Sequence, residues 1–245
     1  MSAQAAIRTE VVKYKAGETE FVGYLAYDDA VEGKRPGVLV VHEWYGLNDY
    51  AKRRANMLAQ IGYVALAADL YGEGRVAASR EEAGALATAL RKDRPLMRAR
   101  ANAALEALRK QPLADPQRLA AMGYCFGGGV VLELARSGAD VRGVVSFHGN
   151  LDTPNAADAK NIKAKVLVLH GADDPHVPAS QVAAFMDEMR KAGVDWQVSF
   201  YGGAVHAFTN PASGNDPKAG AAYNAEADKR SWETMKLFFA EIFAK

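Results

Sequence analysis

Six apolar runs recur along the chain, and turn residues and helical patterns separate them. They cover residues 37–46, 63–72, 118–125, 141–149, 164–174 and 196–203. Apolar runs of this kind are typical of strands that are buried on both faces of a parallel sheet. Because strands and helices alternate along the chain, the pattern predicts a doubly wound α/β fold with a mostly parallel sheet.

The N-terminal part and the helical segments complete this fold class. Residues 10–17 and 20–28 alternate between apolar and polar side chains, which predicts two antiparallel strands joined by a turn at Gly17. Five helices are predicted. The first covers 51–60, the second begins after a capping box of Ser79 and Glu82, and the third runs from Pro95 to about Lys110. The fourth ends at Gly193, and the fifth contains Trp232. No repeat or linker-like change in composition divides the chain. We therefore expect one three-layer α/β/α domain over residues 1–245, with residues 1–8 flexible.

Composition and charge limit the classes of partner and site. The 245 residues carry a formal net charge of +1, which gives no global field for binding nucleic acid or an anionic membrane. A single cysteine excludes an intramolecular disulfide framework and a cysteine-rich zinc site. No pair of histidines has a metal-ligand spacing, and we expect neither metal nor cofactor. The chain start lacks the apolar segment of a secretory signal, and no apolar run approaches the roughly 18 to 20 residues of a membrane helix. We expect a cytoplasmic protein of undetermined oligomeric state.

Reactive or small residues follow nearly every predicted strand, at the sheet edge where α/β proteins place their chemistry. One such stretch, Gly123-Tyr124-Cys125-Phe126-Gly127, has the form of a nucleophile elbow, Gly-x-nucleophile-x-Gly. Its glycines allow a tight strand-to-helix turn, and the N-terminus of the next helix favours a thiolate. The alternative interpretation is a buried, inert cysteine that packs as a small hydrophobic side chain.

A nucleophilic thiol needs a partner base, because a free thiol with a pKa of about 8.5 is only slightly ionised at neutral pH. In hydrolases with this elbow, the order along the chain is nucleophile, acid, histidine. Asp173 and Asp174 follow a later strand and His206 follows the last one, which matches this order. We expect Asp174 to be the acid, since it directly precedes the turn at 175–178, and Asp173 is the alternative.

Four segments resemble the dienelactone hydrolase family, also called carboxymethylenebutenolidases. They are VVHEWYGLN at 40–48, GYCFGG at 123–128, DDPHVP at 173–178 and GGAVHAF at 202–208. The resemblance extends from about residue 10 to the C-terminus. It implies an α/β-hydrolase fold and a cysteine-dependent hydrolase of small lactones or enol esters, anionic ones among them.

The resemblance also implies a role for each matching residue. Cys125 attacks the carbonyl carbon, and His206 carries protons while Asp174 orients it. Glu43 resembles the family glutamate that holds the resting thiol and helps to deprotonate it, although an ordinary loop carboxylate is the alternative. The backbone N–H groups of Phe126 and Trp44 are expected to form the oxyanion hole.

The sequence departs from the family where the substrate carboxylate is bound. The family has an arginine four residues after the catalytic histidine, where this chain has Asn210. A second family arginine lies in a region where this chain is shorter, so Arg75, Arg98 or Arg100 is a candidate for its role. His148 is a candidate for the pocket wall, and the segment 209–230 is either a pocket border or an ordinary surface loop.

Three other functions stay open. The first is a general carboxylesterase on the same scaffold. The second is a glutamine amidotransferase-like enzyme, which shares the Gly-x-Cys-x-Gly elbow but has its acid and histidine close together near the end of the chain. The third is a binding or redox-sensing protein, because an exposed, ionised thiol is easily oxidised. Intact candidates for every catalytic role favour the hydrolase.

Overall fold

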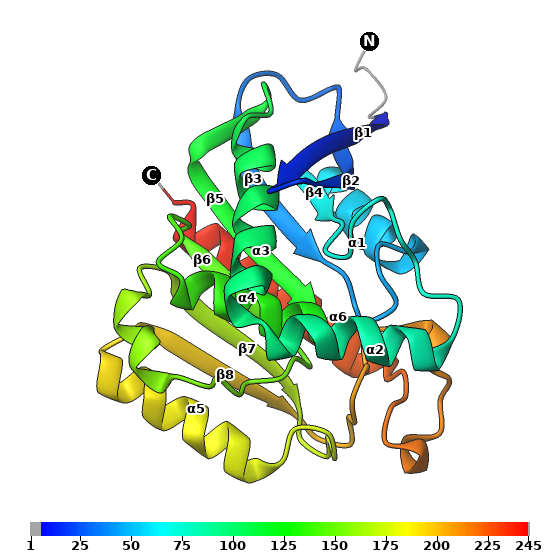
Figure 1. The fold of residues 1–245 in the computed structure, drawn as a ribbon, viewed down its shortest axis with the longest axis vertical. Coiled ribbons are helices and arrows are strands. Elements are labelled where there is room, and N and C mark those ends of the chain that lie inside the picture. The colour runs from blue at the N-terminus through cyan, green and yellow to red at the C-terminus, as the bar shows by residue number, and fades with distance from the viewer. Residues whose placement is uncertain (1–5, 245) are drawn as a thin grey trace. The chain divides into compact units, whose positions relative to one another are not determined.

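The computed structural model describes residues 6–244 and contains one eight-stranded sheet, with strand order β1-β2-β4-β3-β5-β6-β7-β8 (Figure 1). The chain clusters into two compact units that meet between Ala121 and Met122, within β5. Of the start expected to be flexible, residues 1–5 lie outside the described residues, while Ile7 and Arg8 already belong to β1.

The first unit contains seven elements and most of an eighth. They are β1 (Ile7–Ala16), β2 (Thr19–Asp28), β3 (Arg35–Val41), α1 (Asp49–Gln60), β4 (Val64–Ala68), α2 (Arg80–Lys92), α3 (Arg94–Arg109) and β5 (Ala114–Tyr124). β1 and β2 pair antiparallel over their full length around a turn at Gly17, and β3 and β4 pair parallel. This confirms the predicted antiparallel start and the change to a parallel sheet.

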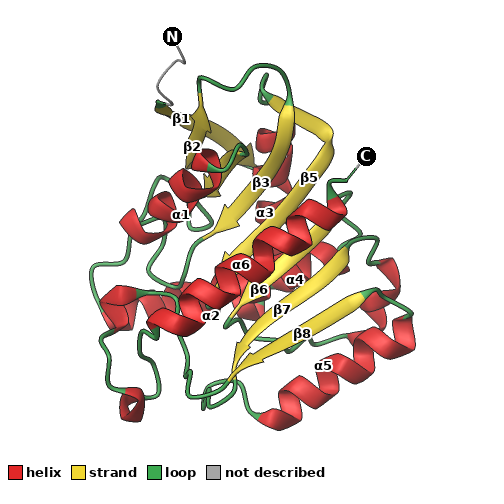
Figure 2. Cartoon of the chain, turned by 180° about the vertical axis from the view of Figure 1, so that it is seen from behind, coloured by secondary structure: helices red, strands yellow, loops and turns green. Residues whose placement is uncertain are grey.

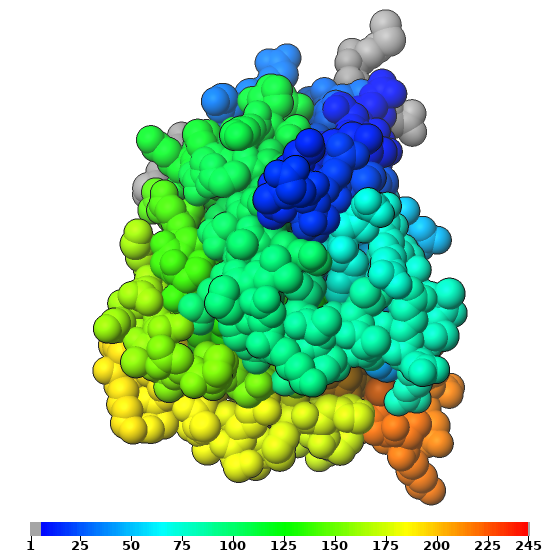
Figure 3. Space-filling model, viewed as in Figure 1, coloured from blue at the N-terminus to red at the C-terminus, as the bar shows by residue number. Residues whose placement is uncertain are grey.

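Helices cover both faces of the strands in the first unit. α1 packs on β2 and β4, whereas α3 packs on β1 and β3 from the other side (Figures 1 and 2). β1 is the edge strand, and Figure 3 shows it in dark blue at the molecular surface. Of its ten residues only Tyr14 is buried, whereas all five residues of β4 are buried, which explains why β1 carries polar side chains and β4 is apolar throughout.

The helix boundaries of the first unit follow from side-chain caps. The Ser79 hydroxyl accepts the Glu82 N–H at 3.1 Å, as a capping box requires. The reciprocal bond differs from the prediction, because the Glu82 carboxylate accepts the Ala78 N–H rather than that of Ser79. Asp93 ends α2 and caps α3, so Pro95 occupies the second position of α3, one residue later than expected.

The second unit contains the remaining parallel strands and the helices that cover them. Its elements are α4 (Phe126–Arg136), β6 (Gly143–Phe147), η1 (Ala156–Asn161), β7 (Lys165–Gly171), α5 (Ala179–Ala192), β8 (Trp196–Tyr201), η2 (Pro211–Ser213), η3 (Pro217–Ala219) and α6 (Ala225–Ile242). The strands β6, β7 and β8 pair parallel in register, as predicted. α4 and α6 lie on opposite faces of β6 (Figures 1 and 2). α5 ends at Gly193, whose φ of +68° confirms the predicted glycine stop.

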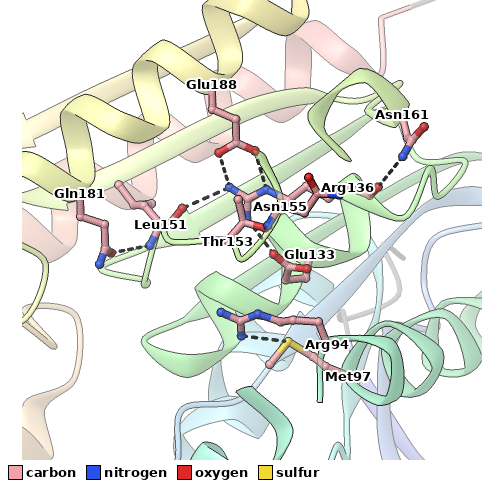
Figure 4. A network of polar contacts seen from close by, with 10 residues as sticks. All are labelled: Arg94, Met97, Glu133, Arg136, Leu151, Thr153, Asn155, Asn161, Gln181 and Glu188. Carbon is pink, nitrogen blue, oxygen red and sulfur yellow. Dashed lines mark hydrogen bonds and ion pairs between the residues drawn. The ribbon is translucent and has the colours of Figure 1, made fainter. Parts of the chain in front are cut away.

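A buried ion-pair network joins α4 to α5 (Figure 4). The Arg136 guanidinium forms two 2.8 Å bonds to the Glu188 carboxylate and one 3.1 Å bond to Glu133, and it also donates to the Leu151 carbonyl. All three charged side chains are at most 4% exposed. Because burial makes an unpaired charge very unfavourable, this network fixes how α5 lies against α4.

Candidate active site

Cys125 is held on a sharp turn between β5 and α4 in the second unit. It has φ +52° and ψ −117°, a conformation that L-residues rarely adopt. Its backbone N–H donates to the Phe147 carbonyl at the end of β6, at 3.0 Å. The side chain is partly exposed, and α4 begins at the next residue, so the positive end of the helix dipole faces the sulfur. This is the strained strand-to-helix geometry of a nucleophile elbow.

The glycines around Cys125 allow two close backbone approaches. A Cβ atom added to Gly123 would lie 2.1 Å from the Gly127 carbonyl oxygen, on the other side of the elbow. A Cβ atom on Gly128 would lie 2.5 Å from the Ser146 hydroxyl oxygen and 2.7 Å from the Gly149 Cα. All three distances are shorter than van der Waals contact. The elbow closes onto Gly127 only because Gly123 lacks a side chain, and α4 approaches the end of β6 only because Gly128 lacks one.

Three side chains from three strand ends form a continuous hydrogen-bonded chain. The His206 Nε2 atom lies 3.1 Å from the Cys125 Sγ atom, and its Nδ1 atom lies 2.8 Å from Asp174 Oδ2. The other carboxylate oxygen of Asp174 accepts the His176 N–H at 2.8 Å. Asp173 faces elsewhere and accepts the Gly203 N–H at 3.0 Å. Of the two candidate acids, Asp174 therefore contacts the histidine, and Asp173 shapes the turn after β8.

The interactions among these three side chains shift the pKa values of His206 and Asp174. Burial disfavours a charged His206 ring, but the interactions with the Cys125 sulfur and the Asp174 carboxylate outweigh this effect and raise its pKa to about 10. Burial likewise disfavours ionised Asp174, yet the bond and charge of His206 and the His176 N–H lower its pKa below the usual value. A pKa of about 10 keeps the His206 ring charged at neutral pH, beside the Cys125 sulfur and the Asp174 carboxylate.

Three further histidines of the second unit lie around His206. The His148 and His176 rings make edge contacts with its ring, at centroid distances of 5.4 and 5.1 Å. His148 is fully buried, whereas His176 is exposed. His170 at the end of β7 is nearly buried, and burial lowers its pKa although the Asp174 charge opposes the shift. No sequence motif points to Thr209, whose hydroxyl contacts the His148 ring.

The predicted glutamate loop follows β3 in the first unit. The Glu43 side chain is buried and Trp44 is half-buried. The His42 Nε2 atom accepts the Leu70 N–H at 3.2 Å, so its Nδ1 atom carries the proton and donates to the Glu43 carbonyl oxygen. Burial lowers the pKa of His42, which keeps it in this neutral form. The Trp44 carbonyl accepts the Tyr71 hydroxyl at 2.7 Å, so the loop is fixed from both sides.

The four residues predicted to bind a substrate anion differ in their burial and in the hydrogen bonds that they already make. Arg75 is exposed and donates two bonds to the Glu82 carboxylate. Arg98 is half-buried on α3. Arg100 donates to the Leu70 carbonyl at 2.7 Å and lies over an aromatic ring, which makes it part of the packing of the first unit. Asn210 is buried, and its side chain caps η2 by accepting the Ala212 N–H.

Between residues 6 and 244, no cluster of three or more histidine, cysteine or acidic side chains is arranged to hold a metal ion. Within the same range, no helix has the length and apolarity needed to cross a membrane.

Comparison with known proteins places the chain among hydrolases. The family model described as the dienelactone hydrolase family matches residues 21–243. A putative carboxymethylenebutenolidase of Saccharolobus solfataricus is 28% identical, over 86% of this chain and 91% of that protein. A probable 2-oxo-3-(5-oxofuran-2-ylidene)propanoate lactonase of a Bradyrhizobium species is 30% identical, over 76% of this chain and 78% of that protein.

One solved structure is similar over nearly the whole chain. It is the dienelactone hydrolase-like promiscuous phosphotriesterase P91 from metagenomic libraries, which is 45% identical with a TM-score of 0.94. The match covers 98% of this chain and all of the other.

Proposed function

Because the chain belongs to the dienelactone hydrolase family, we propose that it is a cysteine-dependent hydrolase of small lactones or enol esters. The observation that carries the proposal is the hydrogen-bonded chain from Cys125 through His206 to Asp174, with distances of 3.1 and 2.8 Å. These distances are within the range needed for proton transfer between a nucleophile and its base.

The proposed reaction proceeds through an acyl-enzyme. The Cys125 thiolate attacks the carbonyl carbon, and the tetrahedral oxyanion collapses as the C–O bond to the leaving oxygen breaks. The His206 imidazolium gives its proton to that oxygen, which leaves Cys125 acylated and His206 neutral. His206 then takes a proton from water as the water attacks the thioester, and the carboxylic acid product leaves with the thiolate restored. Asp174 orients the ring through both steps and stabilises its charged form.

Two further roles in the proposal belong to backbone and loop groups. The N–H groups of Phe126, at the first position of α4, and of Trp44 are assigned to the oxyanion hole. Glu43 is assigned to the resting thiol, as a hydrogen-bond partner that helps to deprotonate it when substrate enters. The Glu43 side chain is buried, and the Glu43 carbonyl accepts the His42 Nδ1–H, which fixes the backbone of this loop. A Glu43→Gln variant should keep the fold but bind and release the thiol proton differently, seen as a changed pH profile of turnover.

The test is turnover of p-nitrophenyl acetate and of a dienelactone by the wild type, Cys125→Ala and Cys125→Ser. The proposal expects no turnover above background in Cys125→Ala and an acyl adduct on Cys125 of the wild type by mass spectrometry. Equal turnover in Cys125→Ala would refute it. Comparing lactones with and without a carboxylate tests the preference for anions, and broad activity on simple esters alone would favour a general carboxylesterase. Rapid alkylation of Cys125 without hydrolysis of any ester would favour a redox-sensing or binding protein.

A second candidate activity is phosphotriester hydrolysis, because the similar P91 structure is described as a promiscuous phosphotriesterase. The thiolate would attack phosphorus and expel a phenolate, and water would then cleave the S–P bond to release a phosphodiester. The test is release of p-nitrophenolate from paraoxon beyond one equivalent per enzyme. Release that stops at one equivalent would show phosphorylation of Cys125 without turnover.

A further inference from the structure

His148 links two loops of the candidate active site through its ring. It is the first residue after β6 and is fully buried. Its Nδ1 atom lies 3.2 Å from the Cys125 backbone nitrogen, and its Nε2 atom lies 2.7 Å from the Thr209 hydroxyl oxygen. Thr209, also fully buried, follows His206 by three residues. One imidazole therefore contacts both the turn that carries the sulfur and the loop that carries the base.

These two contacts determine the protonation of the ring. The Cys125 N–H, which also donates to the Phe147 carbonyl at 3.0 Å, is shared with His148, so the His148 Nδ1 atom must offer a lone pair. A neutral imidazole then carries its proton on Nε2, which donates to the Thr209 hydroxyl. A second proton on Nδ1 would face the Cys125 N–H and break the contact. His148 is thus held as a neutral ring with a fixed tautomer, which suits a role in geometry rather than in proton transfer.

Backbone strain is concentrated at the loops that His148 joins. Among residues 6–244, the non-glycine residues with positive φ are Glu73, Cys125, His148 and Ala207. Three of these four belong to the nucleophile elbow, the end of β6 and the loop after β8. Each such conformation costs about 1 to 3 kcal/mol and persists only where surrounding contacts enforce it. The His148 ring bonds to Cys125 directly and to Thr209, two residues beyond Ala207.

We propose that His148 is a positioning residue that fixes the Cys125 elbow against the His206 loop, with Thr209 as its anchor. The inference rests on the proposed function. Without the anchor, the loop after β8 has one fewer constraint at the point where Ala207 is strained, and the contact from His206 Nε2 to the sulfur becomes less well defined. Chemistry suffers from such a loss more than substrate binding does, because the ion pair is needed in the reacting complex.

The kinetic test uses Thr209→Val, which removes the hydroxyl and keeps the shape, and Thr209→Ser, which keeps the hydroxyl. Thr209→Val should lower kcat about five- to tenfold with KM within about twofold, the effect of one hydrogen bond on a rate. Thr209→Ser should restore kcat. His148→Asn keeps an acceptor close to the Cys125 N–H but is too short to reach Thr209, and asparagine tolerates positive φ. It should reproduce Thr209→Val, and the double variant should be no worse than either.

A second readout needs no substrate and separates this inference from the proposed function. Cys125 is the only cysteine, so iodoacetamide alkylation reports on this thiol alone. Thr209→Val should slow alkylation at neutral pH about five- to tenfold and move its pH profile upward, because a looser imidazolium stabilises the thiolate less. Ser231→Ala removes a buried hydroxyl bond on α6, between Ser231 Oγ and the Asp228 carbonyl, and controls for general destabilisation.

The outcomes are distinct. Slower alkylation in Thr209→Val but not in Ser231→Ala supports the positioning role, even if the wild type hydrolyses no ester and the proposed function fails. Unchanged kcat, KM and alkylation in both Thr209→Val and His148→Asn would overturn the inference, whatever happens to their melting temperatures. An equal change in Ser231→Ala would also overturn it.

Discussion

Replacing Asp174 by asparagine should weaken the charged form of His206 and slow the reaction. The carboxylate accepts the imidazole N–H at 2.8 Å, and its side chain has no solvent exposure. A hydrogen bond to a charged group contributes about 1.5 to 3 kcal/mol. Since 1.36 kcal/mol corresponds to one pH unit or to tenfold in rate, the pKa of His206 should fall by about 1 to 2 from its wild-type value.

The same free energy sets the expected loss in activity. Asp174→Asn should lower kcat/KM about 10- to 150-fold. The sign of the pH effect follows from the direction of the shift. The pKa of His206 is raised to about 10 in the wild type, so the imidazolium is lost only as the pH rises through that value. In the variant, the loss of the imidazolium, and with it of the general acid for the leaving group, should begin at lower pH.

The assay follows turnover of p-nitrophenyl acetate and the ultraviolet absorbance of the thiolate as functions of pH, with Cys125→Ser as the spectral blank. Asp173→Asn is the matched control. Asp173 is adjacent to Asp174 in the sequence, but its carboxylate accepts the Gly203 N–H and does not contact His206. The reasoning is refuted if Asp174→Asn keeps the wild-type alkaline limb and its turnover stays within about twofold. It is also refuted if Asp173→Asn shows the larger loss.

Three further predictions test other parts of the structure. Burial opposes the His206 charge, and the interaction with Cys125 favours it most strongly, so Cys125→Ala should lower the pKa of His206 from about 10. NMR titration of the imidazole measures this shift, and an unchanged value would contradict the electrostatic coupling of the two side chains. Arg136→Met leaves two buried carboxylates without their cation and should cost about 3 to 5 kcal/mol in the free energy of unfolding by urea. Lys191→Met, which breaks an exposed pair on α5, should cost less than about 1 kcal/mol, and equal losses would argue against the buried network. Gly128→Ala places a Cβ atom 2.7 Å from a backbone carbon and should destabilise the fold by about 1 to 3 kcal/mol in the same assay, whereas a neutral effect would show that α4 can move away from β6.

The strands were predictable because most of them are buried on both faces. β7 illustrates this, since the predicted 164–174 contains the observed Lys165–Gly171. The ends were predicted less well. β3 stops at Val41, although the apolar pattern continues through Trp44 and Tyr45, because the chain leaves the sheet at His42 and turns at Trp44 and Tyr45. There the His42 ring donates to the Glu43 carbonyl and accepts the Leu70 N–H. Such a side-chain bond between two loops leaves no periodic signal in the sequence.

The last helix shows a different limit. α6 begins at Ala225, within a segment that reads as a loop because its residues are small and polar. The signal that was present is Asn224, whose side chain accepts the Ala227 N–H and caps the helix. The loop prediction is therefore wrong for residues 225–230. The first two turns carry few apolar side chains, so the hydrophobic periodicity becomes visible only closer to Trp232.

The candidate site could be assembled from sequence only where each residue belongs to a motif at a strand end. Cys125, Asp174 and His206 meet that condition, and the structure brings their side chains together. The contact between His148 and Thr209 does not, because it joins residues 61 positions apart through a ring whose partners depend on the exact path of two loops. Sequence patterns report which face or end of an element a residue occupies, and they do not report which side chains of two loops meet.

Asn210, four residues after His206, is part of the hydrogen bonding that shapes its loop. Asn210 stands where the family has an arginine, and its side-chain oxygen accepts the Ala212 N–H at 3.0 Å to start η2. Its own N–H donates to the carbonyl of Ala207, the strained residue beside His206. Arginine at 210 would remove this cap and bring a charge to a site that is 8% exposed. The loop is built around an asparagine, so a single Asn210→Arg change should disturb His206 before it creates an anion site.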